Sequence, residues 1–290
     1  MTTPHRLVVG YEGGPNGHDA LRFAERWSRA SDDAIVVVTV HPGSAALGIG
    51  HVDAEWVAYE REQADALLAE ARTVLSPDVA AEFRRIDSSS AARGLHELVE
   101  EGGAGLVLGA RRARGLRRTY PGSTAERLLH GSAVPVTIVP SGYADREPDA
   151  IHHVSVAFVD TPDGNAAVDV AVTMTERLHA DLSVVSVLPD TRVTPAMGEP
   201  RRFADGQRDI YQEALERVLA SARQRVPVKG RLLDGPVVDA LVDLGPDEFD
   251  LLVCGSRGYG PVARVLLGGV SSRVVRHARV PVTVVPRPTT

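Results

Sequence analysis

The sequence predicts two tandem α/β domains, each a five-stranded, doubly wound parallel sheet flanked by helices. The 290 residues are enough for two domains of ordinary size. The chain also repeats itself once, and in each copy short apolar runs alternate with segments of helical periodicity. Apolar runs without polar interruption are typical of strands that are buried on both faces, as in a parallel sheet covered by helices.

The repeat has an offset of 146 to 147 residues. Pro15-Asn16-Gly17 corresponds to Pro162-Asp163-Gly164, and the apolar segment 134–140 corresponds to 280–286. A period this long indicates a duplicated domain rather than a solenoid. The polar stretch 141–151 between the copies predicts a linker. We therefore expect one domain at 1–141 and a second at 151–290.

Within the first copy, strands and helices are expected to alternate along the chain. The apolar or β-branched runs predict strands at 7–10, 35–40, 80–86, 106–109 and 136–139. Helical spacing of apolar residues predicts helices around 20–27, 55–75, 95–99 and 123–130. The second copy has the same order. In such sheets, ligands bind beyond the carboxyl ends of the strands, where the strand order reverses.

Composition narrows the functional classes. The formal net charge is −6, which makes non-specific nucleic-acid binding unlikely by default. Cys254 is the single cysteine, so no intrachain disulfide can form, in keeping with a reducing cytoplasm. No apolar run has the length of a membrane span, and no histidine spacing suggests a metal site. We expect a cytoplasmic protein that has no membrane span, no metal site and no catalytic residues.

The strongest chemical signal follows the fourth strand of the second copy. Gly255, Gly258 and Gly268 have the spacing Gly-x2-Gly-x9-Gly. Glycine lets the main chain approach a ligand closely, and the helix that starts at the last glycine presents free N–H groups to phosphate. The spacing alone fits two interpretations equally well: a phosphate-binding loop, or a strand-to-helix loop that binds no ligand.

This spacing resembles the ATP-binding signature of the universal stress protein family. The openings at 9–15 and 154–162 and the closing strands at 134–139 and 280–285 resemble that family too, so the resemblance covers nearly the whole chain in two copies. It implies a Rossmann-like fold of the adenine nucleotide alpha hydrolase type. It also implies ATP as ligand, with or without magnesium, and a regulatory, non-catalytic role in the stress response.

The resemblance further implies where the second copy contacts the nucleotide. Asp160 matches the family's aspartate, with a following turn that is one residue short of the pattern, and Val187 matches a residue beside the adenine. Gly269 stands where the family has Ser or Thr, so Ser271 or Ser272 is expected to replace the missing hydroxyl, or phosphate affinity is lower. The remaining matched positions are Val159, Gly255, Gly258, Gly268 and Val270.

The first copy departs further from the family pattern. Arg112 replaces the middle glycine, where its side chain would either crowd the phosphate path or place a guanidinium on it. We therefore expect a degenerate first site. Residues 123–126, Ser-Thr-Ala-Glu, also predict a capping box. The other matched positions are Glu12, Val40, Gly109, Gly122, Ser123 and Thr124.

Three functions stay open at this point: a nucleotide-binding regulator, a slow ATPase or nucleotide-dependent transferase, and a structural pseudo-dimer whose sites bind nothing. The sequence has no P-loop, and the arginines at 111–118 favour a solvated loop or local phosphate contact over a nucleic-acid surface. The resemblance implies that the last strand of each copy lies at the sheet edge and pairs with its counterpart. Because these strands are also short and apolar, we expect the copies to pair through 134–139 and 280–285 as an internal pseudo-dimer. A homodimer of chains stays open.

Overall fold

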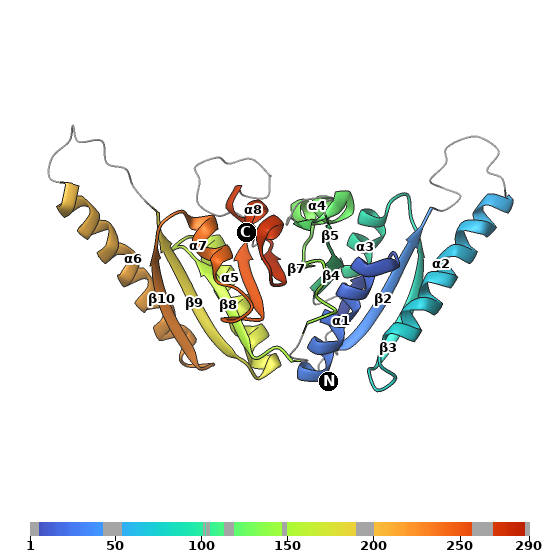
Figure 1. Ribbon diagram of the computed structural model, residues 1–290, viewed down its shortest axis with the longest axis horizontal. Coiled ribbons are helices and arrows are strands. Elements are labelled where there is room, and N and C mark those ends of the chain that lie inside the picture. Colours follow the sequence, from blue (N-terminus) through green and yellow to red (C-terminus); the bar gives the residue numbers. More distant parts are fainter. Residues whose placement is uncertain are drawn as a thin grey trace. The chain divides into compact units, whose positions relative to one another are not determined.

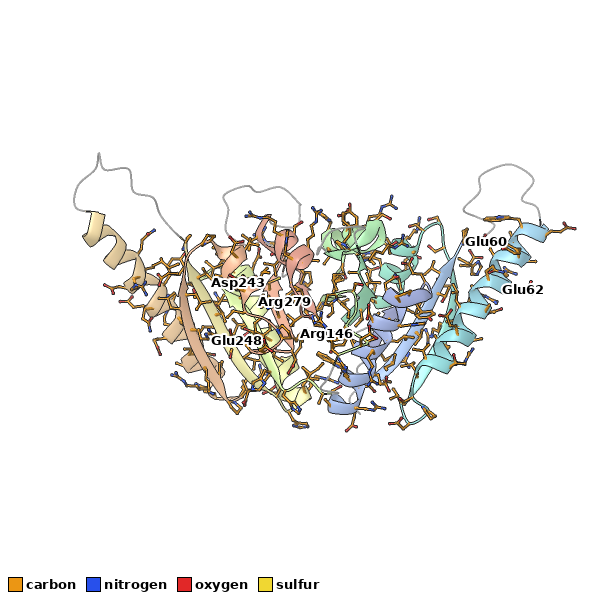
Figure 2. The ribbon with its side chains drawn as sticks, in the orientation of Figure 1. Glu60, Glu62, Arg146, Asp243, Glu248 and Arg279 are labelled. Carbon is orange, nitrogen blue, oxygen red and sulfur yellow. The ribbon has the colours of Figure 1, made fainter. Side chains whose placement is uncertain are left out.

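The computed structural model describes residues 6–42, 54–100, 102, 105–112, 119–146, 150–189, 200–256 and 269–287. The side chains of residues 54, 112, 119 and 200–205 fall outside this description. The chain divides into two compact units, Met1–Ala150 and Ile151–Thr290. Each unit has its own parallel sheet with helices on both faces, which confirms the predicted fold class (Figure 1, and with its side chains in Figure 2).

The first unit has strand order β3-β2-β1-β4-β7, with every neighbouring pair parallel. Because β2 and β3 lie on one side of β1 and β4 and β7 on the other, the order reverses between β1 and β4. The elements are β1 (Arg6–Gly10), α1 (Gly14–Ser31), β2 (Ala34–His41), α2 (Ala54–Val74), β3 (Ala81–Asp87), α3 (Ala91–Glu100), β4 (Gly105–Gly109), α4 (Gly122–Gly131) and β7 (Val136–Val139). A short antiparallel pair that the sequence did not predict, β5 (Arg111–Arg112) and β6 (Thr119–Tyr120), precedes α4.

The second unit repeats this arrangement with strand order β10-β9-β8-β11-β12, again all parallel. Its reversal lies between β8 and β11. The elements are β8 (His153–Phe158), α5 (Pro162–Leu178), β9 (Asp181–Leu188), α6 (Pro200–Ala222), β10 (Val228–Asp234), α7 (Val237–Asp243), β11 (Leu251–Gly255), α8 (Gly269–His277) and β12 (Val282–Val285). Among the described helices of both units, none is long and apolar enough to cross a membrane.

The central strands are buried on both faces, as the uninterrupted apolar runs predicted. The residues from Ile35 to Val38 in β2 are at most 2% exposed, and Leu251, Leu252 and Val253 in β11 are fully buried. Burying one such side chain contributes about 2 kcal/mol. Burial of these apolar side chains holds the strands in the interior of each sheet. A ligand can therefore reach these strands at their ends.

The stretch predicted as a polar linker begins as part of the first unit. The backbone N–H groups of Gly142 and Ala144 donate to the Asp19 carboxylate of α1 at 2.9 and 2.7 Å. Tyr143 is buried between Phe23 and Arg26, whose guanidinium carbon lies 4.6 Å from the ring centroid. Burial raises the pKa of Asp19, and these N–H groups partly offset that rise. The expected boundary at residue 141 thus falls short of the first compact unit, which extends to Ala150.

Candidate functional site

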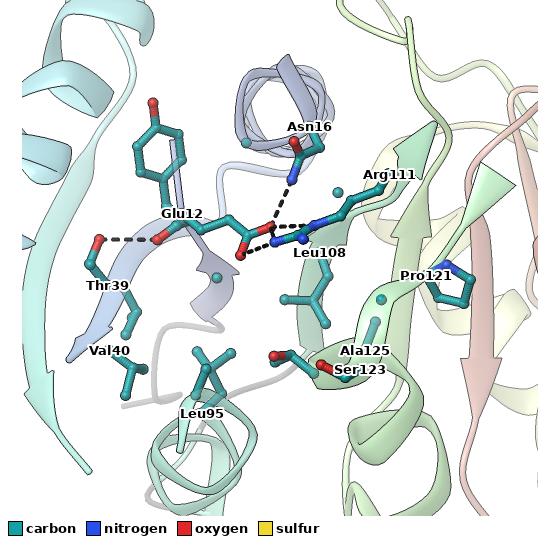
Figure 3. Close-up of a pocket in the computed structure, with 18 of the residues that line it drawn as sticks. Glu12, Asn16, Thr39, Val40, Leu95, Leu108, Arg111, Pro121, Ser123 and Ala125 are labelled. Carbon is teal, nitrogen blue, oxygen red and sulfur yellow. Dashed lines mark hydrogen bonds and ion pairs between the residues drawn. The ribbon is translucent and has the colours of Figure 1, made fainter. Parts of the chain in front are cut away.

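A pocket of about 200 Å³ opens in the first unit at the strand-order reversal (Figure 3). Its walls come from the ends of β1, β2 and β4 and from the starts of α1, α3 and α4. Parallel strands bring these segments together because all their carboxyl ends meet at one edge of the sheet. The predicted first-copy residues that line it are Glu12, Val40, Gly109, Gly122, Ser123 and Thr124.

A charged cluster occupies one wall of this pocket. The guanidinium of Arg111 donates from Nη2 to both carboxylate oxygens of Glu12, at 2.9 and 3.0 Å, and Asn16 donates to the same carboxylate at 2.9 Å (Figure 3). More than half of each side chain in the Glu12–Arg111 pair is exposed. Exposed ion pairs contribute little to stability, so a ligand that offers equivalent partners can replace this one at low cost.

Arg111 places its guanidinium in the pocket wall, where it contacts Glu12. Arg111 and Arg112 form the short strand β5, and they pair with Tyr120 and Thr119 respectively. The Arg112 side chain lies outside the described residues. Arg111 entered the sequence analysis only as one of the arginines at 111–118.

The opposite wall is apolar and tightly packed. Val40, Leu95 and Leu108 contribute side chains to it (Figure 3). Gly109 ends β4 against the start of α1, where a Cβ would lie only 1.8 Å from the carbonyl oxygen of Asn16. Only glycine permits this approach of helix to strand. Gly109 therefore has a packing role here, whether or not a ligand is bound.

The start of α4 forms the third part of the pocket. The helix begins at Gly122, whose φ of 82° is in the left-handed region that favours glycine. Pro121 is the N-cap and no side chain caps the helix, so the predicted capping box is wrong. Ser123 and Thr124 lie inside the first turn and line the pocket instead. Their hydroxyls and the free N–H groups of the turn can hold an anion.

Tyr11 is a pocket residue that the sequence analysis did not identify. Its ring is buried beside Gly17, and its backbone carbonyl accepts a hydrogen bond from Thr39 Oγ1 at 3.1 Å. Burial, reinforced by the Glu70 carboxylate, raises the pKa of the phenol well above its ordinary value. Glu70 in turn contacts His18 Nε2 at 2.8 Å, a hydrogen bond that lowers the pKa of Glu70. Tyr11 is therefore a neutral, rigid part of the pocket wall.

The second unit aligns with the first without a gap in the turn after its first strand. Ser186 Oγ donates to the carbonyl of Phe158 at 3.1 Å, which reproduces the bond from Thr39 to Tyr11. Phe158 therefore corresponds to Tyr11, and Val159 takes the position of Glu12. The expectation of a turn shortened by one residue is wrong. The structure puts a valine where the first unit has its acidic pocket residue.

Asp160 occupies the position of Gly13 and contacts helices instead of strands. Its carboxylate pairs with Arg217 Nη2 of α6 at 2.8 Å and accepts a weak hydrogen bond from Asn165 of α5 at 3.4 Å. Both members of the ion pair are more than half exposed. The predicted contact of Asp160 with a nucleotide would add a further donor to a carboxylate that already accepts from Arg217 and Asn165.

The start of α8 also differs from the expectation. Ser271 is buried, and its hydroxyl donates to the carbonyl of Gly255 at 2.8 Å. This hydrogen bond ties α8 to β11 and uses the hydroxyl proton that a phosphate contact of Ser271 would need. The role of Ser271 at phosphate stays a prediction. Gly269 is exposed and Val270 is half-buried, while Val187 is buried in β9 at the position of Val40. Gly258 and Gly268 lie outside the described residues.

Cys254 is placed where its thiol is protected. The side chain is buried in β11 next to Ser271, and burial raises the thiol pKa to about 12. The thiolate is the reactive form, so this cysteine behaves as a small core residue at neutral pH. Among the described residues, no group of three or more His, Cys, Asp or Glu side chains could hold a metal ion.

Comparisons with known proteins agree with the two-domain fold. The model of the universal stress protein family matches residues 4–140 and 150–286. A universal stress protein of Mycobacterium tuberculosis is 29% identical, covering 97% of this chain and 99% of its own, and one of Mycolicibacterium smegmatis is 26% identical, covering 98% and 97%. The crystal structure of a universal stress protein from Archaeoglobus fulgidus has the same fold, with a TM-score of 0.70, 21% identity and 98% coverage of both chains. The chain therefore belongs to the universal stress protein family, as a member with two tandem domains.

Proposed function

We propose that this chain binds an adenine nucleotide, ATP being the first candidate, and that binding regulates a partner or an assembly. The pocket of the first unit supports this proposal most directly. It combines an apolar wall, a hydrogen-bond acceptor and an anion-binding helix start in one crevice. These are the three kinds of group that the base, ribose and phosphates of a nucleotide require.

Each part of the pocket suits one part of the ligand. Val40 and Leu95 offer an apolar surface for the flat base. Glu12 can accept hydrogen bonds from ribose hydroxyls, which would replace the bonds it now accepts from Arg111 and Asn16. The released Arg111 guanidinium and the first turn of α4 would then meet the phosphates, where charge-assisted hydrogen bonds are strongest.

We expect the second unit to bind more tightly than the first. Its complete Gly-x2-Gly-x9-Gly spacing resembles the ATP-binding signature, and Gly258 leaves room for the backbone to approach phosphate. The corresponding residue of the first unit is Arg112. A residue with a side chain does not let the backbone approach phosphate as closely as glycine does. The first unit keeps compensating groups in Arg111, Ser123 and Thr124, so we expect it to bind weakly rather than not at all.

A regulatory role fits the described pocket better than catalysis. Phosphoryl transfer needs a base or water-positioning residue aimed at the reacting oxygen and a positioned metal. Glu12 is the acidic side chain lining the pocket, and its carboxylate is already bound by a guanidinium and an amide. That environment favours the role of a hydrogen-bond acceptor. Magnesium would arrive with ATP, and a cytoplasmic location remains our expectation.

Calorimetric titration with ATP tests the proposal. Gly258→Gln should remove the tighter site, Ser123→Trp should fill the weaker one, and the double variant should bind nothing. Ser123 is exposed at its pocket, so its substitution leaves the protein core undisturbed. A thermal unfolding curve of Gly258→Gln controls for a loss of folding. ATP binding by the double variant with wild-type affinity would refute nucleotide binding in these two crevices. Parallel assays of ADP release, with and without magnesium, test the non-catalytic role.

The pairing of the two copies stays a prediction. β7 and β12 are each the last strand at one side of their own unit's sheet, and both are short and apolar. Exposed apolar edge strands promote aggregation unless they are paired or covered. A charge at Val136 or Val282 should loosen the pairing and expose apolar surface, which gel filtration after cleavage of the linker would reveal.

A further inference from the structure

We propose that Asp163, and not Asp160, supplies the ligand-binding carboxylate of the second crevice. This inference rests on the proposed function, because it names a residue that would contact the ribose of the nucleotide. It starts from a difference between the two units. The first unit has Glu12 at the end of β1 and Asn16 at the start of α1, whereas the second has Val159 and Asp163 at the same two positions.

The correspondence of Asp163 with Asn16 is structural as well as sequential. In the first unit, the backbone of Asn16 abuts Gly109 at the end of β4, and its side chain lines the pocket. In the second unit, the backbone of Asp163 abuts Gly255 at the end of β11, where a Cβ would lie 2.9 Å from the Asp163 carbonyl oxygen and 3.5 Å from its Cβ. Asp163 therefore occupies, at the reversal between β8 and β11, the place that a pocket residue has in the first unit.

The side chain of Asp163 is largely buried, and one of its carboxylate oxygens lacks a hydrogen bond. Its side chain is 12% exposed, and Oδ1 is buried without a hydrogen bond from any described residue. The guanidinium Nε of Arg287, just beyond β12, lies 3.8 Å from Oδ1, close enough for electrostatic attraction but too far for a hydrogen bond. A buried acceptor without a donor is unfavourable, and a ligand hydroxyl in this crevice would satisfy it.

Asp160 lacks these properties. Its carboxylate is more than half exposed and is already bound by Arg217 and Asn165. The carboxylate thus belongs to Glu12 at the strand end in the first crevice, and to Asp163 in the first turn of α5 in the second. Vicinal ribose hydroxyls are the matching donors, because an ionised carboxylate accepts but cannot donate.

The test compares ATP with 2′,3′-dideoxy-ATP, which lacks both ribose hydroxyls, by calorimetric titration of the full chain carrying Ser123→Trp. We expect this parent to prefer ATP, Asp163→Asn to lose about tenfold in ATP affinity, and the preference for ATP to disappear. The matched control Asp160→Asn should keep both the affinity and the preference. The exchange variant Val159→Glu/Asp163→Asn recreates the Glu12–Asn16 arrangement and should restore the preference.

Other outcomes separate this inference from the proposed function. A parent that binds no ATP would refute nucleotide binding in the second unit, and the role of Asp163 with it. A parent that binds ATP while Asp163→Asn keeps the preference would overturn the inference alone. An Asp163 that merely stabilises the start of α5 would lower the unfolding temperature when replaced and leave the preference intact, which also overturns it.

Discussion

The two halves of this chain share one strand order but build their crevices from different residues. The first half has an acid at the strand end, an arginine after β4 and two hydroxyls at the start of α4. The second half has a valine, the glycine spacing, and Gly269 and Val270 in place of the hydroxyls. The packed strands are equivalent, while the residues at their carboxyl ends differ. Duplication thus preserved the scaffold and allowed the ligand-facing positions to diverge.

Gly109 and Gly255 should give the largest difference between the halves. A Cβ at Gly109 would lie 1.8 Å from a backbone oxygen, against 2.9 Å at Gly255. Gly109→Ala should therefore cost about 3 kcal/mol in the free energy of unfolding, and Gly255→Ala about 1 kcal/mol. Urea denaturation followed by circular dichroism measures both. Equal losses would show that the two strand–helix junctions are equally adaptable.

The second-largest difference in stability between the halves should come from Asp19, because Ala166 stands at the corresponding position of the second half. Asp19→Ala removes the acceptor for two backbone N–H groups and should cost about 2 kcal/mol. It should also speed proteolytic cleavage after residue 141. The reverse change, Ala166→Asp, serves as a control and should bring no such protection.

The pH dependence follows from the raised pKa of Asp19. A carboxyl whose folded pKa exceeds the unfolded value binds more protons when folded, so its effect on stability becomes less favourable as the pH rises between the two values. The free energy of unfolding of the wild-type protein should therefore decline as the pH rises from about 4 through the raised pKa of Asp19. Denaturation of Asp19→Asn across that window should lack the decline. A variant with the wild-type pH profile would assign the change to other groups.

Arg111 and Arg112 test which guanidinium serves the first crevice. Arg111→Ala should weaken ATP binding to the first half by about tenfold, since one charge-assisted contact is lost. Arg112→Ala should have little effect on that half. Calorimetry in the Gly258→Gln background isolates the first site. A larger loss from Arg112→Ala would reverse the assignment of the two side chains.

Ser271 should show the smallest effect. Its counterpart in the first half is Ala125, which is buried and has no hydroxyl. Ser271→Ala should cost about 1 kcal/mol through the lost bond to the Gly255 carbonyl, and ATP affinity should stay within about twofold. Ser272→Ala is the matched control for stability. Strong loss of ATP affinity in Ser271→Ala would return this hydroxyl to the phosphate site.

Most of the fold could be predicted because periodic apolar patterns report burial directly. The strands at 7–10, 35–40 and 106–109 follow from side chains that a two-faced core selects. The short pair β5–β6 and the docking of Tyr143 on α1 could not be predicted, since both depend on partners distant in the sequence. For the same reason the capping box at 123–126 was wrong, as the path of the chain before Gly122 decides where the helix begins.

The sequence by itself determined the duplication, the order of strands and helices along the chain and the residues available to each crevice. Tertiary structure alone decided which of these residues face the crevice. Arg111 lines the first pocket, and Val159 rather than Asp160 takes the place of Glu12. The physical reason is that side-chain direction alternates along a strand and is reset by each turn. A one-residue difference in register therefore moves a charge from the site to the surface.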